Sequence, residues 1–237
     1  MIPARIVDIR QSTPTVKSFV LDLGRHTFHF LPGQWIDCYA NLDGEEAVAG
    51  YSLTSMPLDT RAIQISVKLV GENPVTHHLH HDAKVGDLLQ VDGGHGDFQF
   101  TTETASSVVL IAGGIGITPL ISIIRTLDGT DADVEAKLVY SVRSANELLF
   151  GAELDQISAR NSRITWTPTV TRASPGWQGR TGRIDERLLR EAGLFPKVGV
   201  ASRPLYFICG PLGMTDDMVA LVRSCGVPPG DIHYERW

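Results

Sequence analysis

The sequence predicts two architectures in succession, an antiparallel β-barrel and then an α/β doubly wound parallel sheet. Over the first hundred residues, short runs rich in Val, Ile and aromatic residues alternate with turn signals such as Pro32-Gly33 and Asp43-Gly44. This pattern is typical of a small barrel. From the run SVVLIA onward, continuous apolar strands alternate with helical patterns, as in a sheet covered on both faces. The change near residue 104 predicts two domains, a barrel domain over residues 1–104 and an α/β domain over residues 105–237.

The individual elements follow from the same patterns. Barrel strands are expected at residues 4–11, 15–23, 35–42, 62–70 and 88–93, with a brief helix at residues 75–83. Strands of the parallel sheet are expected at residues 107–112, 136–141, 164–170, 205–210 and 232–237. Helices are expected between them at residues 118–127, 145–159, 184–192 and 213–225.

Composition and charge exclude several classes of protein. Hydrophobic residues make up 43% of the chain, but no apolar run approaches the about 18 residues of a membrane span, and the start lacks the pattern of a secretory signal. The net charge of −6 argues against nucleic acid or an anionic membrane as the partner. The three cysteines are too few and too widely spaced for a disulfide framework or an iron–sulfur cluster. We therefore expect reduced thiols and a cytoplasmic protein.

A glycine-rich turn follows the first strand of the predicted sheet, in AGGIGITPL. Gly113, Gly114 and Gly116 allow a tight turn and a close approach to a ligand, Thr118 can cap the next helix, and Pro119 suits its first position. A helix N-terminus presented in this way favours a pyrophosphate. Because proline occupies the third glycine position of the usual fingerprint, the turn alone is weak evidence for a nucleotide.

The residues after the second strand bear on the choice between NAD and NADP. An acidic residue there would bind the ribose hydroxyls of NAD, but this chain reads YSVRSAN, with Ser141, Arg143 and Ser144 and no acid. Arg143 is suited to a 2′-phosphate, and it is equally well read as a solvated loop residue.

A second turn is predicted to reach the same edge of the sheet. The strand YFICG is followed by Gly210-Pro211 and a helix, and ligands bind beyond the carboxyl ends of parallel strands. A crossover through that helix makes the last strand parallel as well, so Trp237 is expected at the ligand edge. A flat cofactor can stack on this indole there; the alternative is a Trp packed between the two domains.

Taken in order, these motifs resemble those of the ferredoxin–NADP reductase-like flavoproteins. The stretches IAGGIGITPLISIIR, YSVRSANELLF, YFICGP and the ERW end are most similar to oxidoreductase NAD-binding-domain-containing proteins. The resemblance covers nearly the whole chain. It implies FAD as cofactor, NADPH or NADH as electron donor, and an enzyme that passes electrons on to a separate acceptor.

The resemblance also assigns roles to individual positions. It implies that Tyr51 and Ser52 contact the isoalloxazine, with Ser52 near flavin N5, that Cys209 lies beside the nicotinamide, that Trp237 covers the flavin and that Glu235 assists proton transfer. Further cofactor contacts are implied at Leu53, Thr54, Val67, Lys68, Pro74, Val75, Thr76, Met214, Arg172 and Arg183. Taken singly, Ser52 is better read as a strand hydroxyl, Cys209 as a buried apolar residue and Glu235 as a surface acid. Taken together in the family order, the functional readings are favoured for Ser52, Cys209 and Trp237, and narrowly for Glu235.

One position departs from the family pattern. Members usually carry an arginine two residues before the Tyr-Ser pair, where it binds the flavin phosphates, and here that position is Ala49. Loss of a charge-assisted bond of about 1.5–3 kcal/mol would weaken FAD by one to two orders of magnitude. Loosely bound FAD, FMN in its place, or compensation by neighbouring groups are the consequences to test.

Nearby histidines are candidates for that compensation. His77, His78, His80 and His81 crowd one short element and are read as a solvated helix end, a phosphate contact or, least of all, a metal site.

Three functional hypotheses follow. The first is a flavin-dependent NAD(P)H oxidoreductase. The second is a flavin reductase that uses flavin as a released substrate, which Ala49 favours. The third is a nucleotide-binding regulatory subunit without turnover, against which Ser52, Cys209 and Trp237 argue.

Overall fold

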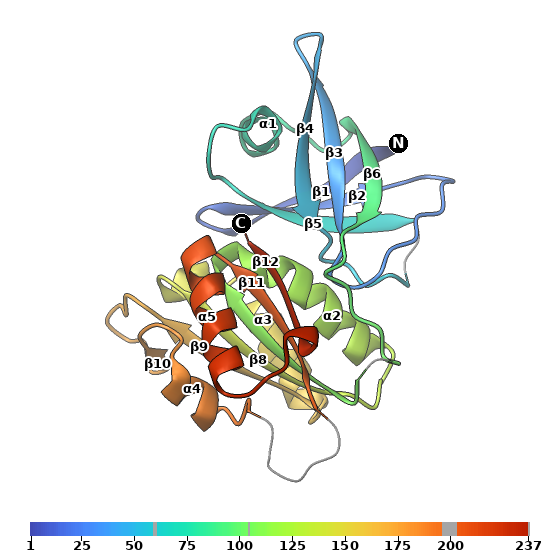
Figure 1. The fold of residues 1–237 in the computed structure, drawn as a ribbon. Coiled ribbons are helices and arrows are strands. Elements are labelled where there is room, and N and C mark those ends of the chain that lie inside the picture. The colour runs from blue at the N-terminus through green and yellow to red at the C-terminus, as the bar shows by residue number, and fades with distance from the viewer. Residues whose placement is uncertain (59–60, 104, 196–202, 237) are drawn as a thin grey trace.

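The protein is described by a computed structural model that covers residues 1–58, 61–103, 105–195 and 203–236. Its two halves carry separate sheets, an antiparallel one above and a parallel one below in the view of Figure 1. The predicted fold class is therefore confirmed. No helix in the described ranges is long and apolar enough to cross a membrane.

The first sheet contains six antiparallel strands in the order β4-β3-β6-β1-β2-β5. An isolated bridge between Leu53 and Ile65 joins the end of β4 to β5, so the two outer strands meet and the sheet closes into a barrel. The short helix α1 (Pro74–His81) packs Val75 and Leu79 against the barrel core. The strands are β1 (Ile2–Thr13), β2 (Val16–Asp22), β3 (Trp35–Leu42), β4 (Glu45–Ser52), β5 (Ala62–Lys68) and β6 (Leu88–His95).

Strand β4 does not appear among the apolar runs that predict the other barrel strands. Its sequence EEAVAGYS is poor in β-branched residues, and only the Tyr-Ser motif indicates it. The strand forms because Asp43 and Gly44 adopt φ angles of 54° and 90°, the left-handed pair of a tight hairpin, and pair it with β3. Tertiary pairing thus overrides weak strand propensity here.

The second sheet contains six parallel strands in the order β10-β9-β8-β7-β11-β12. Helices α2 and α3 pack on one face and helices α4 and α5 on the other (Figure 1). The strands are β7 (Ser107–Gly113), β8 (Glu135–Val142), β9 (Ile164–Val170), β10 (Arg180–Thr181), β11 (Leu205–Gly210) and β12 (Ile232–Arg236). The helices are α2 (Ile117–Gly129), α3 (Gly151–Arg160), α4 (Glu186–Glu191) and α5 (Leu212–Ser224), with single turns η1 (Gly114–Gly116), η2 (Ala145–Glu147) and η3 (Pro229–Asp231).

The helix expected over residues 145–159 is interrupted. It consists of η2 and then α3, because Phe150 adopts a left-handed conformation with φ of 63°. The ring of Phe150 instead lies 4.9 Å from the guanidinium of Arg125 on α2.

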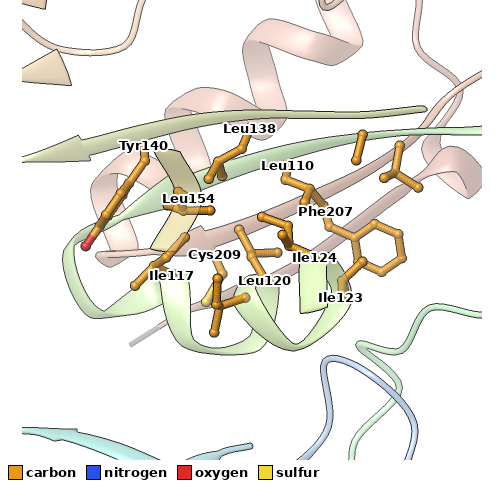
Figure 2. Packing of buried hydrophobic residues seen from close by; sticks show 14 of the residues in the cluster. Leu110, Ile117, Leu120, Ile123, Ile124, Leu138, Tyr140, Leu154, Phe207 and Cys209 are labelled. Atoms are coloured by element: carbon orange, nitrogen blue, oxygen red, sulfur yellow. The ribbon is translucent and has the colours of Figure 1, made fainter. Parts of the chain in front are cut away.

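Helix α2 is buried between the parallel sheet and the barrel. Every residue from 117 to 124 is buried, as expected of a helix that is covered on all sides. Figure 2 shows Leu120 and Ile124 near Leu110 and Phe207 of the sheet, and Ile117 at the other end of the cluster beside Leu154 and Tyr140. This packing fixes α2 on the parallel sheet.

Candidate active site

The parallel sheet reverses its strand order between β7 and β11. The chain leaves β7 through η1 into α2 on one face, and leaves β11 into α5 on the other. A crevice at the carboxyl ends of these two neighbouring strands is where such sheets bind ligands. Gly114 has a φ of 55°, and a side chain at Gly116 would collide with the carbonyl of Cys209, so the two turns touch only because glycine occupies these places.

Two details of the predicted turn are wrong. Helix α2 begins at Ile117, with Gly116 as its N-cap, so Thr118 and Pro119 occupy its second and third positions. The Thr118 hydroxyl does not cap the helix but donates to the carbonyl of Ile115 at 2.9 Å. Pro119 still falls in the first turn, where the missing N–H has no intrahelical partner to lose.

A first pocket of about 250 Å³ opens between β4, β5, α1 and the turn after β7. It brings together predicted cofactor residues from both halves: Tyr51, Ser52, Lys68 and Thr76 of the barrel with Thr118 of α2. Its lining consists of residues 49–52, Ser66, Lys68, Val70, Asn73, Thr76, Ile115 and Thr118.

Hydrogen bonds fix α1 against β4 at the edge of this pocket. The hydroxyls of Tyr51 and Thr76 lie 2.9 Å apart. Asn73 caps α1 by accepting from the amides of Val75 and Thr76, and its amide nitrogen donates to the carbonyl of Val48 at 3.1 Å. Burial raises the pKa of Tyr51 to about 12, so it presents a neutral phenol. Asn73 was missed at the sequence level, although Asn-Pro before a helical run is a recognisable N-cap signal.

The four histidines of α1 lie outside the pocket lining. His80 is buried, its Nε2 lies 2.9 Å from the carbonyl of Val67, and desolvation lowers its pKa, so it is a neutral structural group. The rings of His77 and His81 lie 5.7 Å apart on one helix face. Within the described residues, no group of three candidate metal ligands is found.

A second pocket of about 440 Å³ follows the carboxyl edge of the parallel sheet. It contains seven of the residues predicted to bind a dinucleotide: Gly113, Gly114, Ser141, Arg143, Arg183, Pro211 and Met214. Two negatively charged side chains, Glu147 and Asp217, also line it and were not foreseen. Arg172 does not line this pocket, and its backbone amide donates to the carbonyl of Arg143. Lys68 lines both pockets, which therefore adjoin at its side chain.

Other predicted residues lie near the pockets without lining them. Cys209 is fully buried among the side chains beneath α2, beside Leu120 in Figure 2. The other members of this group are Leu53, Thr54, Val67, Pro74, Val75, Gly116, Pro119 and Gly210. The predicted residue Trp237 is not one of them, because it lies outside the described residues.

Glu235 is a partly buried acid at the junction of the two halves. Among the described residues, its buried Oε2 atom has no hydrogen-bond partner, and its Oε1 lies 3.6 Å from where a side chain on Gly96 of the barrel would begin. Desolvation raises its pKa to about 7. A carboxyl in this state can hold or release a proton near neutral pH.

The residues present fit the two groups that such a site implies. The first pocket combines a tyrosine, a serine hydroxyl, a lysine and a capped helix N-terminus, which suits a flat ring with a phosphate chain. The second combines a glycine turn with two arginines, which suits a dinucleotide. Glu235 lines neither pocket, so its buried oxygen does not bear on this fit.

Comparison with known proteins agrees with this assignment. An oxidoreductase FAD-binding domain model matches residues 3–100, and an oxidoreductase NAD-binding domain model matches residues 110–220. The chain is 33% identical to the glycine betaine monooxygenase reductase subunit of Chromohalobacter salexigens, over 98% of this chain and 63% of that protein. It is 30% identical to ferredoxin–NADP reductase B of Sorangium cellulosum, over 99% and 96%.

Two further similarities extend over the whole chain. The chain is 30% identical to oxidoreductase NAD-binding domain-containing protein 1 of Pongo abelii, over 99% of this chain and 79% of that protein. It superimposes with a TM-score of 0.85 on the FAD/NAD-binding domain of nitric oxide dioxygenase from Vibrio cholerae, at 26% identity and over 100% and 98% of the two chains. The chain belongs to the ferredoxin–NADP reductase-like family of FAD- and NAD-binding oxidoreductases. The predicted family, enzyme class and cofactors are confirmed.

Proposed function

We propose that this protein is a flavin-dependent reductase that takes electrons from NADPH or NADH and delivers them to a separate protein acceptor. The observation that carries the proposal is the meeting of the two pockets at Lys68 and Gly114. The Lys68 ammonium lies 4.0 Å from where a side chain on Gly114 would begin, so the two pockets adjoin. The first pocket is called the flavin pocket below, and the second the dinucleotide pocket. Two flat rings bound in them can approach each other, which is the condition for direct hydride transfer.

The residues of the chain act by binding and orienting in this proposal. Bound FAD would supply the capacity to take up a hydride from the nicotinamide and to release electrons singly or as a pair. Tyr51 and Ser52 orient the ring in the first pocket, and the N-terminus of α1 together with Lys68 faces its phosphates. Arg143 and Arg183 bind the phosphates of the electron donor. Below pH about 7, Glu235 holds a proton at the junction.

Cys209 keeps its proposed place near the nicotinamide, but it acts there through packing. Its side chain lies under α2, and its carbonyl contacts Gly116. Trp237 remains the proposed cover of the flavin ring. We also propose residue 104 as the boundary between domains, which the matched ranges of the two domain models support.

The acceptor is proposed to be an oxygenase component or a ferredoxin-type protein, and the compartment to be the cytoplasm. The chain spans 63% of the length of the glycine betaine monooxygenase reductase subunits it matches, and 96% of a ferredoxin–NADP reductase. The names of these relatives support a protein acceptor in both cases. A cytoplasmic location would supply NAD(P)H and keep Cys38, Cys209 and Cys225 reduced.

A second candidate, a flavin reductase that releases its flavin, is favoured by Ala49 in the first pocket. The side chain at this position is a methyl group where a guanidinium would bind phosphate. The two candidates differ in how long flavin is retained.

The test is anaerobic titration of the FAD-reconstituted protein with NADH and NADPH, followed by gel filtration. The proposal expects bleaching of flavin absorbance near 450 nm by about one equivalent of donor, with flavin co-eluting with protein. Bleaching with complete loss of flavin on the column selects the flavin reductase. Absence of bleaching with either donor overturns both and leaves a nucleotide-binding subunit.

A further inference from the structure

Two side chains of α2 bind the chain segment that directly follows Ser52. The Ser122 hydroxyl donates to the carbonyl of Ser55 at 2.7 Å, and Nη1 of Arg125 donates to the carbonyl of Thr54 at 2.6 Å. We propose that Ser122 and Arg125 are positioning residues that set the separation of the flavin and nicotinamide rings. The inference rests on the proposed function and adds to it two residues that line neither the flavin nor the dinucleotide pocket.

The Arg125 side chain is held in a single arrangement. Its Nε and Nη2 donate to the two carboxylate oxygens of Glu153 on α3, each at 2.7 Å, and its guanidinium lies over the ring of Phe150. Its Nη1 also donates to Oε1 of Gln64 on β5 at 3.2 Å. Only 18% of the side chain is exposed. A planar bidentate pair of this kind fixes direction as well as distance.

The two contacted carbonyls belong to the segment that positions Ser52. Thr54 lies two residues beyond Ser52, and its amide donates to the carbonyl of Gln64 at 2.8 Å. The Ser55 hydroxyl accepts from the amide of Gln64. The segment therefore has one set of bonds to the barrel and a second set to α2, and a displacement of α2 is transmitted to Ser52.

The N-terminal end of α2 lies beside the two pockets. Its first turn follows Gly114, which lines the dinucleotide pocket, and includes Thr118, which lines the flavin pocket. Ser122 and Arg125 lie three residues apart on one face of the same rigid helix. The helix thus connects the glycine turn after β7 to the segment that follows Ser52. A misplacement of about 1 Å between reacting groups can reduce a rate about 10²-fold.

A matched control lies beside this contact. Arg160 of α3 pairs with Asp128 of α2 in the same cavity of about 490 Å³ that Arg125 and Glu153 line. This second arginine–carboxylate pair joins two helices of the parallel-sheet half, and within the described residues neither side chain is hydrogen-bonded to the barrel. Replacing Arg160 changes charge and packing in the cavity, but it leaves the hydrogen bonds of Ser122 and Arg125 to Ser55 and Thr54 intact.

The experiment is stopped-flow reduction of FAD-reconstituted protein under anaerobic conditions with NADH and with NADPH. Wild type is compared with Ser122→Ala, Arg125→Gln, Arg125→Lys and Arg160→Gln. We expect Ser122→Ala and Arg125→Gln to lower the limiting rate of flavin reduction by about 10- to 100-fold. The half-saturating concentration of the donor and the dissociation constant of FAD should each stay within about threefold of wild type. Arg125→Lys should recover part of the rate because it keeps a cationic donor near Thr54, and Arg160→Gln should match wild type.

The outcomes separate this inference from the proposed function. Wild-type limiting rates in both Ser122→Ala and Arg125→Gln, with only a lower melting temperature, would show a purely stabilising contact and overturn the inference. Should Arg125→Gln fail to fold, Ser122→Ala decides alone, because it removes one hydroxyl and no charge. If wild type itself is not reduced by either donor, the proposed function falls and the inference falls with it.

Discussion

Replacement of Ala49 by arginine tests the main departure of this chain from its family. Ala49 lines the flavin pocket and lies two residues before Tyr51 on β4, so the two side chains point to the same side of the strand. The neighbouring lining supplies Asn73 and Lys68, but the position itself carries only a methyl group. Ala49→Arg would add a guanidinium within reach of the phosphates of a bound flavin.

The size of the effect follows from the added interaction. A charge-assisted hydrogen bond contributes about 1.5–3 kcal/mol. Each 1.4 kcal/mol is about a tenfold change in dissociation constant. Ala49→Arg should therefore tighten FAD about 10- to 100-fold. The Lys68 ammonium already contributes positive charge to the pocket, and repulsion between the two cations places the expected value toward the lower end.

The assay compares three flavins rather than one. Dissociation constants for FAD, FMN and riboflavin are measured by quenching of flavin fluorescence, for wild type, Ala49→Arg and Ala49→Met. The methionine variant adds a long side chain without charge. We expect Ala49→Arg to tighten FAD and FMN and to leave riboflavin, which lacks phosphate, within about threefold of wild type. The gain should shrink as salt rises from 0.05 to about 0.5 M, because exposed charges are screened.

Two results would refute this reasoning. Equal tightening of riboflavin would mean that the long side chain packs on the ring rather than on phosphate. No change for any flavin would mean that Ala49 does not face the phosphates, and the proposed orientation of the cofactor in the first pocket would be wrong.

Three further predictions concern Ser52, the arginines at and near the dinucleotide pocket, and Glu235. Ser52→Ala should slow flavin reduction about tenfold, the value of one hydrogen bond, with flavin affinity nearly unchanged in the same fluorescence titration. In steady-state assays, Arg143→Ala and Arg183→Ala should each raise the half-saturating concentration of NADPH about tenfold or more. The half-saturating concentration of NADH should rise much less. Arg172 lies outside the pocket, so Arg172→Ala should change neither concentration. The pKa of Glu235 is raised by burial from 4.5 to about 7, so the folded protein loses stability as pH rises between these values, and chemical denaturation should find Glu235→Gln more stable than wild type at pH 8 but not at pH 4. The full shift sets an upper bound of about 3 kcal/mol, which partial exposure of the carboxyl reduces to about 1–2 kcal/mol.

Much of the fold could be predicted because its signals are local. Strands β3, β9 and β11 have the bounds predicted from their apolar runs, and the glycine turns after β7 and β11 occur where the sequence places them. These segments are periodic or continuous enough that propensity and tertiary context agree. The bounds of α2 and α3 were less predictable, because Gly116 caps one helix and the left-handed Phe150 delays the other.

The candidate site was predictable where residues share a motif and not where they meet only in space. The order of the Tyr51-Ser52 pair, the Gly113–Gly116 turn and Cys209 was enough to indicate a flavin and a dinucleotide. Asn73 carries a local N-cap signal, but its bond to Val48 depends on a contact between residues distant in the sequence. The same holds for the place of the pocket acids Glu147 and Asp217.

The sequence by itself determined the class of chemistry through the order of its motifs and the family resemblance that they carry, since each motif is a property of a short segment. The tertiary structure alone decided that Cys209 packs beneath α2, that Lys68 borders both pockets, and that Ser122 and Arg125 reach across to the carbonyls of Thr54 and Ser55. Ser122 and Ser55 are separated by 67 positions along the chain, and Arg125 and Thr54 by 71. Their contact depends on how the barrel rests on the buried helix, a packing arrangement that no local pattern encodes.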